Sequence, residues 1–153
     1  MVKILMVCLG NICRSPMAEG IMREKLKESQ IKGMVDSCGT ASYHVGDDPD
    51  RRAQSCLMNH NIDIHSLRGR QFDISDFDKF DYIFTMDENN YRDIKSLCRS
   101  ERDEAKVSMI MNEVYPNQNK AVPDPYYGGI EGFEYTYELL DLACEKIAKR
   151  LKN

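Results

Sequence analysis

The sequence contains no run of apolar residues long enough to cross a lipid bilayer. It also lacks the marks of a secretion signal, because no charged segment, long apolar stretch and small-residue cleavage site follow one another near its start. The chain instead begins directly with the strand-like run from Lys3 to Val7. These absences argue against a membrane protein and against a secreted one, and we expect the protein to be cytoplasmic.

A block of basic residues is missing as well. The 21 lysine and arginine residues are outnumbered by 25 aspartate and glutamate residues, which gives a formal net charge of -4. Because a negative overall field repels polyanions, we expect no nucleic-acid partner and no membrane partner. The pairs Arg51–Arg52 and Arg68/Arg70 are small local clusters, which are typical of a solvated face or of a substrate rim.

Internal repeats, low-complexity tracts and linker-like shifts in composition are also absent. Of the 153 residues, 42% are hydrophobic and 30% are charged. A chain of this length can bury one core without a metal or a disulfide to hold it together. We therefore expect a single domain over residues 1–153, and we expect it to be a monomer.

The composition argues against a disulfide framework and against a metal site. The six cysteines are even in number, but their spacing is irregular and no secretion signal accompanies them, so we expect mostly free, buried thiols. His60 and His65 lack cysteine or carboxylate partners at zinc spacing. We expect no metal and no cofactor. The cysteines are Cys8, Cys13, Cys38, Cys56, Cys98 and Cys144.

Short apolar runs alternate along the chain with segments of helical periodicity. This pattern predicts an α/β fold in which a four-stranded parallel sheet carries helices on both faces. Ligands of such sheets bind at the carboxyl ends of the strands, so the two longest loops, residues 39–48 and 115–132, are candidates to border a site. The predicted strands are residues 3–7, 34–38, 82–86 and 106–110, and the predicted helices follow Pro16, Pro49 and Asp87 and cover residues 133–151.

The segment after the first predicted strand has the composition of an anion site. From Cys8 to Pro16 the chain leaves the strand and enters a helix, which turns successive backbone N–H groups inward at a helix N-terminus. Gly10 and Asn11 are residue types that tolerate the left-handed turns such a loop requires. Arg14 can then grip two phosphate oxygens with its planar guanidinium.

Cys8 is the predicted nucleophile of this segment. A free cysteine is only a few per cent thiolate at neutral pH, so a nucleophilic cysteine needs groups that stabilise its negative charge. The loop amides, the Ser15 hydroxyl and the Arg14 guanidinium can together supply this stabilisation. The sequence therefore predicts a thiolate at the bottom of a phosphate-sized bowl.

Asp124 is the candidate general acid. It stands between Pro123 and Pro125, which stiffen the backbone, and ahead of Tyr126 and Tyr127, which can wall a slot for a flat aromatic ring. A tyrosine leaving group has a pKa near 10 and departs readily only when it is protonated. We expect Asp124 to supply this proton and later to act as the base for the water that hydrolyses phosphocysteine.

Together these residues resemble the low-molecular-weight protein tyrosine phosphatases, whose signature is a cysteine, five residues, an arginine and a serine just after the first strand, with a late Asp-Pro-Tyr-Tyr segment. The likeness covers nearly the whole chain. It implies a flavodoxin-like, phosphotyrosine phosphatase I fold and the hydrolysis of phosphotyrosine through a phosphocysteine. The roles that it implies are nucleophile for Cys8, phosphate binding for Arg14, thiolate stabilisation for Ser15, loop geometry for Asn11 with Ser37 behind it, and general acid for Asp124.

The resemblance also implies tyrosine-phosphorylated proteins as substrates, and therefore a tyrosine kinase that supplies them. It implies that Cys13, beside the nucleophile, forms a reversible disulfide that protects Cys8 from overoxidation. The residues implied to form the phosphate loop and the substrate cleft are Leu9, Gly10, Asn11, Ile12, Cys13, Ser15, Tyr43, His44, Tyr126 and Tyr127.

Two positions depart from the family pattern. Many members have a histidine shortly before the pair Arg70–Gln71, where it supports the loop asparagine, whereas Leu67 or Arg68 stands nearest that place here. Whether His65 takes over this role stays open. Tyr43 stands where bacterial members often have tryptophan, which leaves the substrate preference at the rim open.

Three other functions fit parts of the pattern. A thiol-dependent arsenate reductase can share the fold and the loop, but it needs further mobile cysteines, and Cys98 stands alone in its region. A protein-arginine phosphatase of the same family typically has threonine at the position of Ile12. A catalytically silent phosphotyrosine-binding module would normally have lost the nucleophile, the arginine or the acid. The sequence favours the tyrosine phosphatase.

Overall fold

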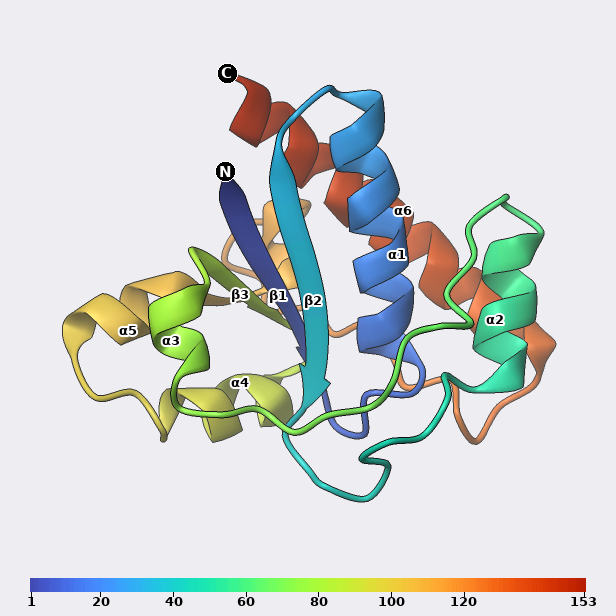
Figure 1. Cartoon of the computed structure of the whole chain (residues 1–153), viewed down its shortest axis with the longest axis horizontal. Helices are drawn as coiled ribbons and strands as arrows, with labels where there is room; N and C mark the ends of the chain where they lie inside the picture. Colours follow the sequence, from blue (N-terminus) through green and yellow to red (C-terminus); the bar gives the residue numbers. More distant parts are fainter.

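Four parallel strands form one sheet in the order β2-β1-β3-β4 in the computed structural model, which describes residues 1–153 (Figure 1). The predicted α/β fold with a four-stranded parallel sheet is confirmed, and each predicted strand overlaps an observed one. The strands are β1 (Val2–Cys8), β2 (Gly33–Gly39), β3 (Tyr82–Thr85) and β4 (Val107–Met109).

The central strand β1 is apolar and buried from Ile4 to Val7 because both of its faces are covered there. Ile4 and Met6 pack into the larger hydrophobic cluster on one face of the sheet, whereas Leu5 and Val7 pack into a smaller cluster on the other. All four side chains are 0% exposed. Since alternate side chains of a strand point to opposite faces, an unbroken apolar run marks a strand buried on both sides.

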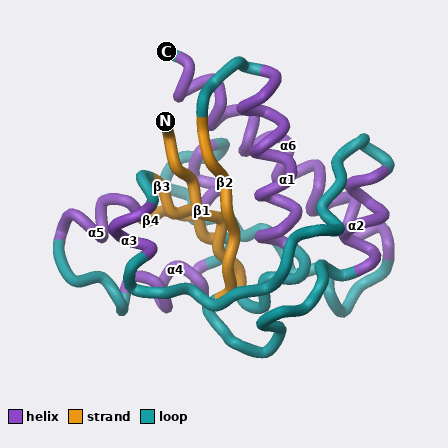
Figure 2. Tube along the Cα trace, in the orientation of Figure 1, coloured by secondary structure: helices purple, strands orange, loops and turns teal.

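Helices cover both faces of the sheet, as predicted (Figures 1 and 2). The predicted helices after Pro16, Pro49 and Asp87 and over residues 133–151 are all present, and Asp87 caps its helix by accepting the N–H of Asn90 at 2.8 Å. No helix has both the length and the apolar character needed to cross a membrane. One face carries α1 (Arg14–Glu28), α2 (Arg51–Met58) and α6 (Ile130–Lys152), and the other carries α3 (Asp76–Lys79), α4 (Glu88–Lys95) and α5 (Glu101–Lys106).

The chain order of the strands places a binding position at the carboxyl end of β1. From β1 the chain passes through α1 to β2 on one side, and it later returns to β3 on the other side of β1. Such a reversal leaves a crevice at the carboxyl ends of the strands. Three segments without strand or long helix meet the sheet there, residues 9–13 (the phosphate loop), residues 40–50 (the rim loop) and residues 121–129 (the acid loop).

Candidate active site

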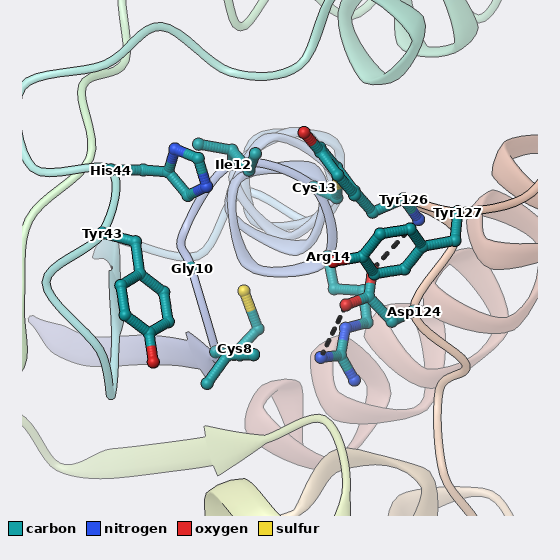
Figure 3. Close-up of a pocket in the computed structure, with 11 residues that line it drawn as sticks. Cys8, Gly10, Ile12, Cys13, Arg14, Tyr43, His44, Asp124, Tyr126 and Tyr127 are labelled. Carbon is teal, nitrogen blue, oxygen red and sulfur yellow. Dashed lines mark hydrogen bonds and ion pairs between the residues drawn. The ribbon is translucent and has the colours of Figure 1, made fainter.

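A cavity of about 240 Å³ opens at the carboxyl end of β1 (Figure 3). Its walls come from the phosphate loop, the start of α1, the rim loop and the acid loop, which are far apart in the sequence. The two long loops that were expected to border a site therefore do so. The lining residues are Cys8, Leu9, Gly10, Ile12, Cys13, Arg14, Tyr43, His44, Asp124, Tyr126 and Tyr127.

Cys8 ends β1 and lies at the floor of this cavity. Only 3% of the residue is exposed, and its Sγ accepts the backbone N–H of Asn11 at 3.3 Å and lies 3.0 Å from the hydroxyl of Ser15. No side chain caps the N-terminus of α1, so the first N–H groups of this helix have no side-chain partner. The partial positive charge of a helix N-terminus and the nearby donors make this position a binding site for an anion.

Arg14 forms one wall of the cavity and is held from behind. Its Nη1 donates to the carboxylate of Asp87 at 2.7 Å and to the carbonyl of Val122 at 3.0 Å, while its Nη2 lies 3.7 Å from Asp124. Burial would lower the pKa of the Arg14 guanidinium, but the negative charges of Cys8 and Asp87 outweigh burial and raise it. A guanidinium fixed in this way presents a rigid, permanently charged plane to an anion.

Asp124 lies at the mouth of the cavity, above Arg14 (Figure 3). Its Oδ1 accepts the backbone N–H of Tyr126 at 3.1 Å, and its Oδ2 is the oxygen nearest Arg14. The side chain is 39% exposed, so the carboxyl can exchange protons with solvent. This position, opposite the nucleophile, is where a leaving group of a phosphate ester would emerge.

Aromatic side chains flank the mouth on two sides (Figure 3). Tyr43 from the rim loop stands on one side, and Tyr126 and Tyr127 from the acid loop stand on the other, with the two rings of the acid loop 5.0 Å apart edge to face. Tyr43 and Tyr127 are largely exposed. Flat apolar walls around a narrow opening suit an aromatic ring.

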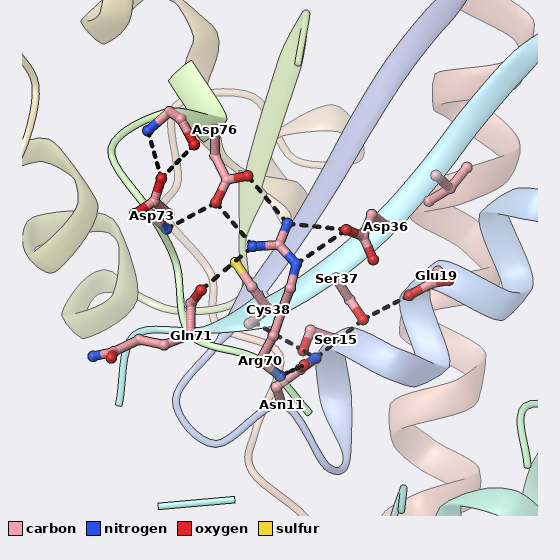
Figure 4. A network of polar contacts seen from close by, with 12 residues as sticks. Asn11, Ser15, Glu19, Asp36, Ser37, Cys38, Arg70, Gln71, Asp73 and Asp76 are labelled. Atoms are coloured by element: carbon pink, nitrogen blue, oxygen red, sulfur yellow. Dashed lines mark hydrogen bonds and ion pairs between the residues drawn. The ribbon is translucent and has the colours of Figure 1, made fainter. Parts of the chain in front are cut away.

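Asn11 holds the phosphate loop in shape from beneath (Figure 4). Its φ of 58° is left-handed, as predicted for this position, and its side chain is buried. The side-chain Nδ2 donates to the hydroxyls of Ser15 at 2.7 Å and Ser37 at 3.0 Å, and the Oδ1 accepts the backbone N–H of Arg70 at 3.0 Å. Asn11, Ser15 and Ser37 therefore lie behind the cavity wall rather than on it.

Gly10 does not adopt the left-handed backbone expected for it. The glycine with a positive φ is Gly46. Space explains the glycine instead. A Cβ at Gly10 would lie 3.1 Å from Cδ2 of His44, which is closer than ordinary van der Waals contact. The rim loop thus packs directly onto the phosphate loop, and a larger residue at position 10 would push the two apart.

The histidine that many family members use to support the loop asparagine has no counterpart here. The side chain of His65 is 70% exposed and bonds to Asp63 at 2.7 Å rather than to Asn11. The backbone N–H of Arg70 donates to the side-chain Oδ1 of Asn11 instead. His65 therefore does not support the phosphate loop in this structure.

Sequence reasoning missed a second layer of polar residues below the loop (Figure 4). The hydroxyl of Ser37 donates to the buried Glu19 at 2.7 Å, and the guanidinium of Arg70 pairs with Asp36 at 2.9 Å and with the buried Asp76 at 3.0 Å. Burial raises the pKa of the Glu19 carboxyl. These partners belong to four different elements or loops, so no local spacing in the sequence identifies them.

Asp87 was predicted only as a helix cap, but it also pairs with Arg14. One carboxylate oxygen accepts the N–H of Asn90 and the other accepts Arg14 Nη1. Its position immediately after β3 could have revealed the second role, because the carboxyl ends of parallel strands meet at one edge of the sheet.

Cys13 lines the same cavity as Cys8 but differs from it in chemistry. The residue is 4% exposed, and burial raises the pKa of its thiol far above the ordinary value, with the charge of Asp50 adding to the effect. Cys13 therefore stays protonated at neutral pH. All six cysteines are free thiols, and no group of three or more His, Cys, Asp or Glu side chains is arranged to hold a metal ion.

A family model described as low molecular weight phosphotyrosine protein phosphatase matches residues 3–153. The chain belongs to this family. A low molecular weight phosphotyrosine protein phosphatase from Schizosaccharomyces pombe is 41% identical, over 93% of this chain and 92% of its own. The crystal structure of a protein tyrosine phosphatase from Entamoeba histolytica, with Hepes in its active site, matches with a TM-score of 0.92 and 38% identity over 99% of this chain and 97% of that one.

The same fold includes a phosphatase with another substrate. The crystal structure of a Drosophila arginine phosphatase matches this low molecular weight phosphatase with a TM-score of 0.92 and 31% identity, over 99% of each chain. The family predicted from the Cys8 and Asp124 motifs is confirmed.

Proposed function

We propose that this phosphatase hydrolyses phosphotyrosine in two steps, by transfer of the phosphoryl group to Cys8 and then to water. The observation that carries the proposal is the arrangement of three groups around one cavity. The Cys8 sulfur lies at the floor, the Arg14 guanidinium forms a wall, and the Asp124 carboxyl stands at the mouth. These are the positions of a nucleophile, an anion clamp and an acid for an in-line displacement.

In the first step the Cys8 thiolate attacks phosphorus. A sulfur–phosphorus bond forms while the bond from phosphorus to the phenolic oxygen breaks, and Asp124 transfers its proton to that oxygen. Arg14 and the loop N–H groups bind the phosphate oxygens, whose charge must be stabilised throughout. A positioned acid contributes about 10²–10⁴ in rate to such a departure.

In the second step the product tyrosine has left and water takes its place. The Asp124 carboxylate accepts a proton from this water as its oxygen attacks phosphorus. The phosphorus–sulfur bond breaks, Cys8 returns to the thiolate and inorganic phosphate leaves. Asp124 ends the cycle protonated, as it began.

Phosphoarginine is the alternative substrate, because an arginine phosphatase shares the fold at 31% identity. Two features support tyrosine. The mouth is walled by Tyr43, Tyr126 and Tyr127, which suit an aromatic ring. Ile12, which lines the cavity, is apolar at the position where the arginine phosphatases typically have threonine.

The test compares phosphotyrosine, phosphoserine and phosphoarginine as substrates of wild type and of Cys8→Ser, with a metal chelator present. We expect wild type to prefer phosphotyrosine and to be unaffected by chelator. The Cys8→Ser variant should have no measurable activity. A preference for phosphoarginine would reassign the substrate. Activity that persists in Cys8→Ser would contradict the covalent mechanism.

We also propose that Cys13 protects the nucleophile. Peroxide would oxidise the Cys8 thiolate to a sulfenic acid, and the Cys13 sulfur would then displace water to form a disulfide, which a dithiol reduces. Both sulfurs belong to residues lining one cavity, which supports the pairing. Wild type inactivated with peroxide should recover fully in dithiothreitol and Cys13→Ser should recover much less; equal recovery would contradict the role.

As physiological context we propose a monomer in the cytoplasm that acts on tyrosine-phosphorylated proteins, with a tyrosine kinase supplying its substrates. Six free thiols, one of them the nucleophile, favour a reducing compartment. Light scattering during gel filtration tests the oligomeric state, and a mass corresponding to a dimer would contradict the monomer.

A further inference from the structure

Arg52, in the first turn of α2, connects segments that are distant in sequence. Its Nε and Nη2 donate to the two carboxylate oxygens of Asp50 at 3.1 Å and 2.9 Å. The same guanidinium donates to two backbone carbonyls of the acid loop, from Nη2 to Tyr126 at 2.9 Å and from Nη1 to Gly128 at 3.2 Å. One side chain therefore spans from α2 to the loop that carries Asp124.

Asp50 fixes the other end of this connection to the phosphate loop. Its backbone N–H donates to the carbonyl of Ile12 at 2.8 Å, and its side chain caps α2 by accepting the N–H of Arg52 at 2.8 Å. The path from Ile12 through Asp50 and Arg52 to Tyr126 consists of hydrogen bonds between groups held at each end. The Asp50–Arg52 pair thus joins the two loops that face each other across the cavity.

Val122 and Pro123, at the start of the acid loop, are held by Met86, Arg14 and Thr136, but residues 124–128 have few supports other than Arg52. Within residues 124–128, every hydrogen bond that comes from outside the loop is donated by Arg52. The Arg52 guanidinium also lies 4.7 Å from the ring of Phe133 and 5.5 Å from the ring of Tyr126, which limits its movement. Without Arg52, the segment from Asp124 to Gly128 would keep its internal turns, the buried Pro125 beside Gly132, and the contact of Asp124 with Arg14, but no hydrogen bond from outside the loop.

We propose that Arg52 is a positioning residue that sets the distance between Asp124 and the nucleophile. This inference rests on the proposed role of Asp124 as general acid. A displacement of about 1 Å at a reacting group can cost 10²-fold in rate, and a loop without helix or strand can move by that amount. Phosphate binding should be spared, because the Asn11 contacts hold the phosphate loop without Arg52.

The test measures kcat/KM of Arg52→Ala for two aryl phosphates, phosphotyrosine and 2,4-dinitrophenyl phosphate, whose leaving group needs no proton. We expect a loss of about 10- to 10²-fold for phosphotyrosine and less than about 3-fold for the dinitrophenyl ester. Arg52→Lys should fall between wild type and Arg52→Ala, because one ammonium cannot reach the carboxylate and both carbonyls. Arg51→Ala, an exposed neighbour on the same helix, should behave like wild type.

A double-mutant cycle with Asp124→Asn separates the proposed acid role of Asp124 from the proposed positioning role of Arg52. If Arg52 acts through Asp124, adding Arg52→Ala to Asp124→Asn should cause no further loss on phosphotyrosine. If Asp124→Asn alone has no effect on phosphotyrosine, the proposed acid is wrong. If Asp124→Asn is severely impaired but the losses of the two variants multiply, Asp124 stands and the positioning role of Arg52 is wrong.

Two measurements guard against a folding defect. The inhibition constant of inorganic phosphate should stay within about twofold of wild type in Arg52→Ala, because Arg14 and the loop amides are untouched. Thermal unfolding should show one cooperative transition. Equal losses on both aryl phosphates, or weaker phosphate binding in parallel with lost activity, would overturn the proposal, since they would indicate general damage to the site.

Discussion

The phosphate loop and the acid loop face each other across one cavity but are held in different ways. In the phosphate loop, Asn11 is buried and makes three side-chain hydrogen bonds, and its partners are anchored in turn by Glu19 and Asp76. In the acid loop, every residue except Val122 and Pro125 is exposed, and from Asp124 to Gly128 its outside hydrogen bonds come from Arg52.

The difference follows from what each loop must do. The phosphate oxygens carry negative charge in the substrate, the phosphocysteine and the product, so their donors gain from being fixed in advance. The acid must give up a proton, take one back and let the tyrosine depart, which a loop at the protein surface permits. Damage to the phosphate loop should therefore affect every substrate, whereas damage to the acid loop should depend on the leaving group.

Asp124→Asn removes the proposed acid and should have the largest effect. On phosphotyrosine we expect kcat/KM, which reports the step in which the leaving group departs, to fall by about 10²–10⁴. The loss on 2,4-dinitrophenyl phosphate should be smaller, because this leaving group departs without a proton. Steady-state kinetics on both substrates checks this, and inhibition by inorganic phosphate should be unchanged. Equal losses on both substrates would remove Asp124 from the role of acid.

Arg14→Lys removes the proposed bidentate contact with the phosphate oxygens. A point charge cannot reproduce the bidentate grip or satisfy Asp87 and Val122 together, so we expect kcat/KM to fall by about 10²–10³. In contrast to Asp124→Asn, the loss should be the same for both leaving groups, and inorganic phosphate should inhibit more weakly. Near-wild-type activity would refute the clamp.

Asn11→Gly sharpens the comparison, because glycine keeps the left-handed backbone and removes only the side-chain hydrogen bonds. We expect kcat/KM to fall by about 10- to 10²-fold, because the loss of a side chain that orients a functional group typically has an effect of this size. Asn61→Gly is the matched control, since Asn61 is exposed with a φ of 63° away from the cavity. If both variants behave like wild type, the side-chain network does not shape the loop.

Glu19→Gln probes the deepest part of the network and should have the smallest effect. Burial raises the pKa of Glu19 above its ordinary value of 4.5, so the folded protein binds this proton more tightly than the unfolded chain does. The contribution of Glu19 to stability should therefore fall as the pH rises from 4.5 through the higher folded pKa. Below 4.5 the carboxyl is protonated in both states.

Urea unfolding at a series of pH values measures this effect. Relative to Glu19→Gln, wild type should lose stability as the pH rises through this window and then level off. Glu28→Gln, an exposed carboxylate on the same helix, is the matched control and should track wild type. A stability difference between wild type and Glu19→Gln that does not change with pH, or that changes in the opposite direction, would contradict the raised pKa.

The sequence was most informative where structure and chemistry are local. The apolar run of β1, the loop from Cys8 to Ser15 and the proline-flanked Asp124 are contiguous patterns, and each lies where it was expected. The short helices α3 and α5 were not predicted, because four to six residues are too few to establish a helical period.

Contacts between distant segments could not be predicted. The sequence gives no spacing that joins Arg52 to the acid loop or Arg70 to Asp76 beneath the phosphate loop. Gly10 shows the same limit, because its residue type indicated backbone freedom whereas the folded chain uses it for close packing against His44. Whether His65 supports the loop likewise depended on where the rim and Arg70 lie in space.

Trapping the phosphoryl group on Cys8 would distinguish transfer through the enzyme from direct attack of water on the substrate. 2,4-Dinitrophenyl phosphate, whose leaving group needs no proton, would be mixed with Asp124→Asn, which lacks the base for the second step. The reaction would be quenched in acid within one turnover, and the digested protein analysed by mass spectrometry. We expect a phosphorylated peptide with the phosphate on Cys8, retained when Cys13→Ser is added and absent when Cys8→Ser is added. Release of dinitrophenol with no phosphorylated enzyme, or phosphate on another residue, would contradict the phosphocysteine mechanism.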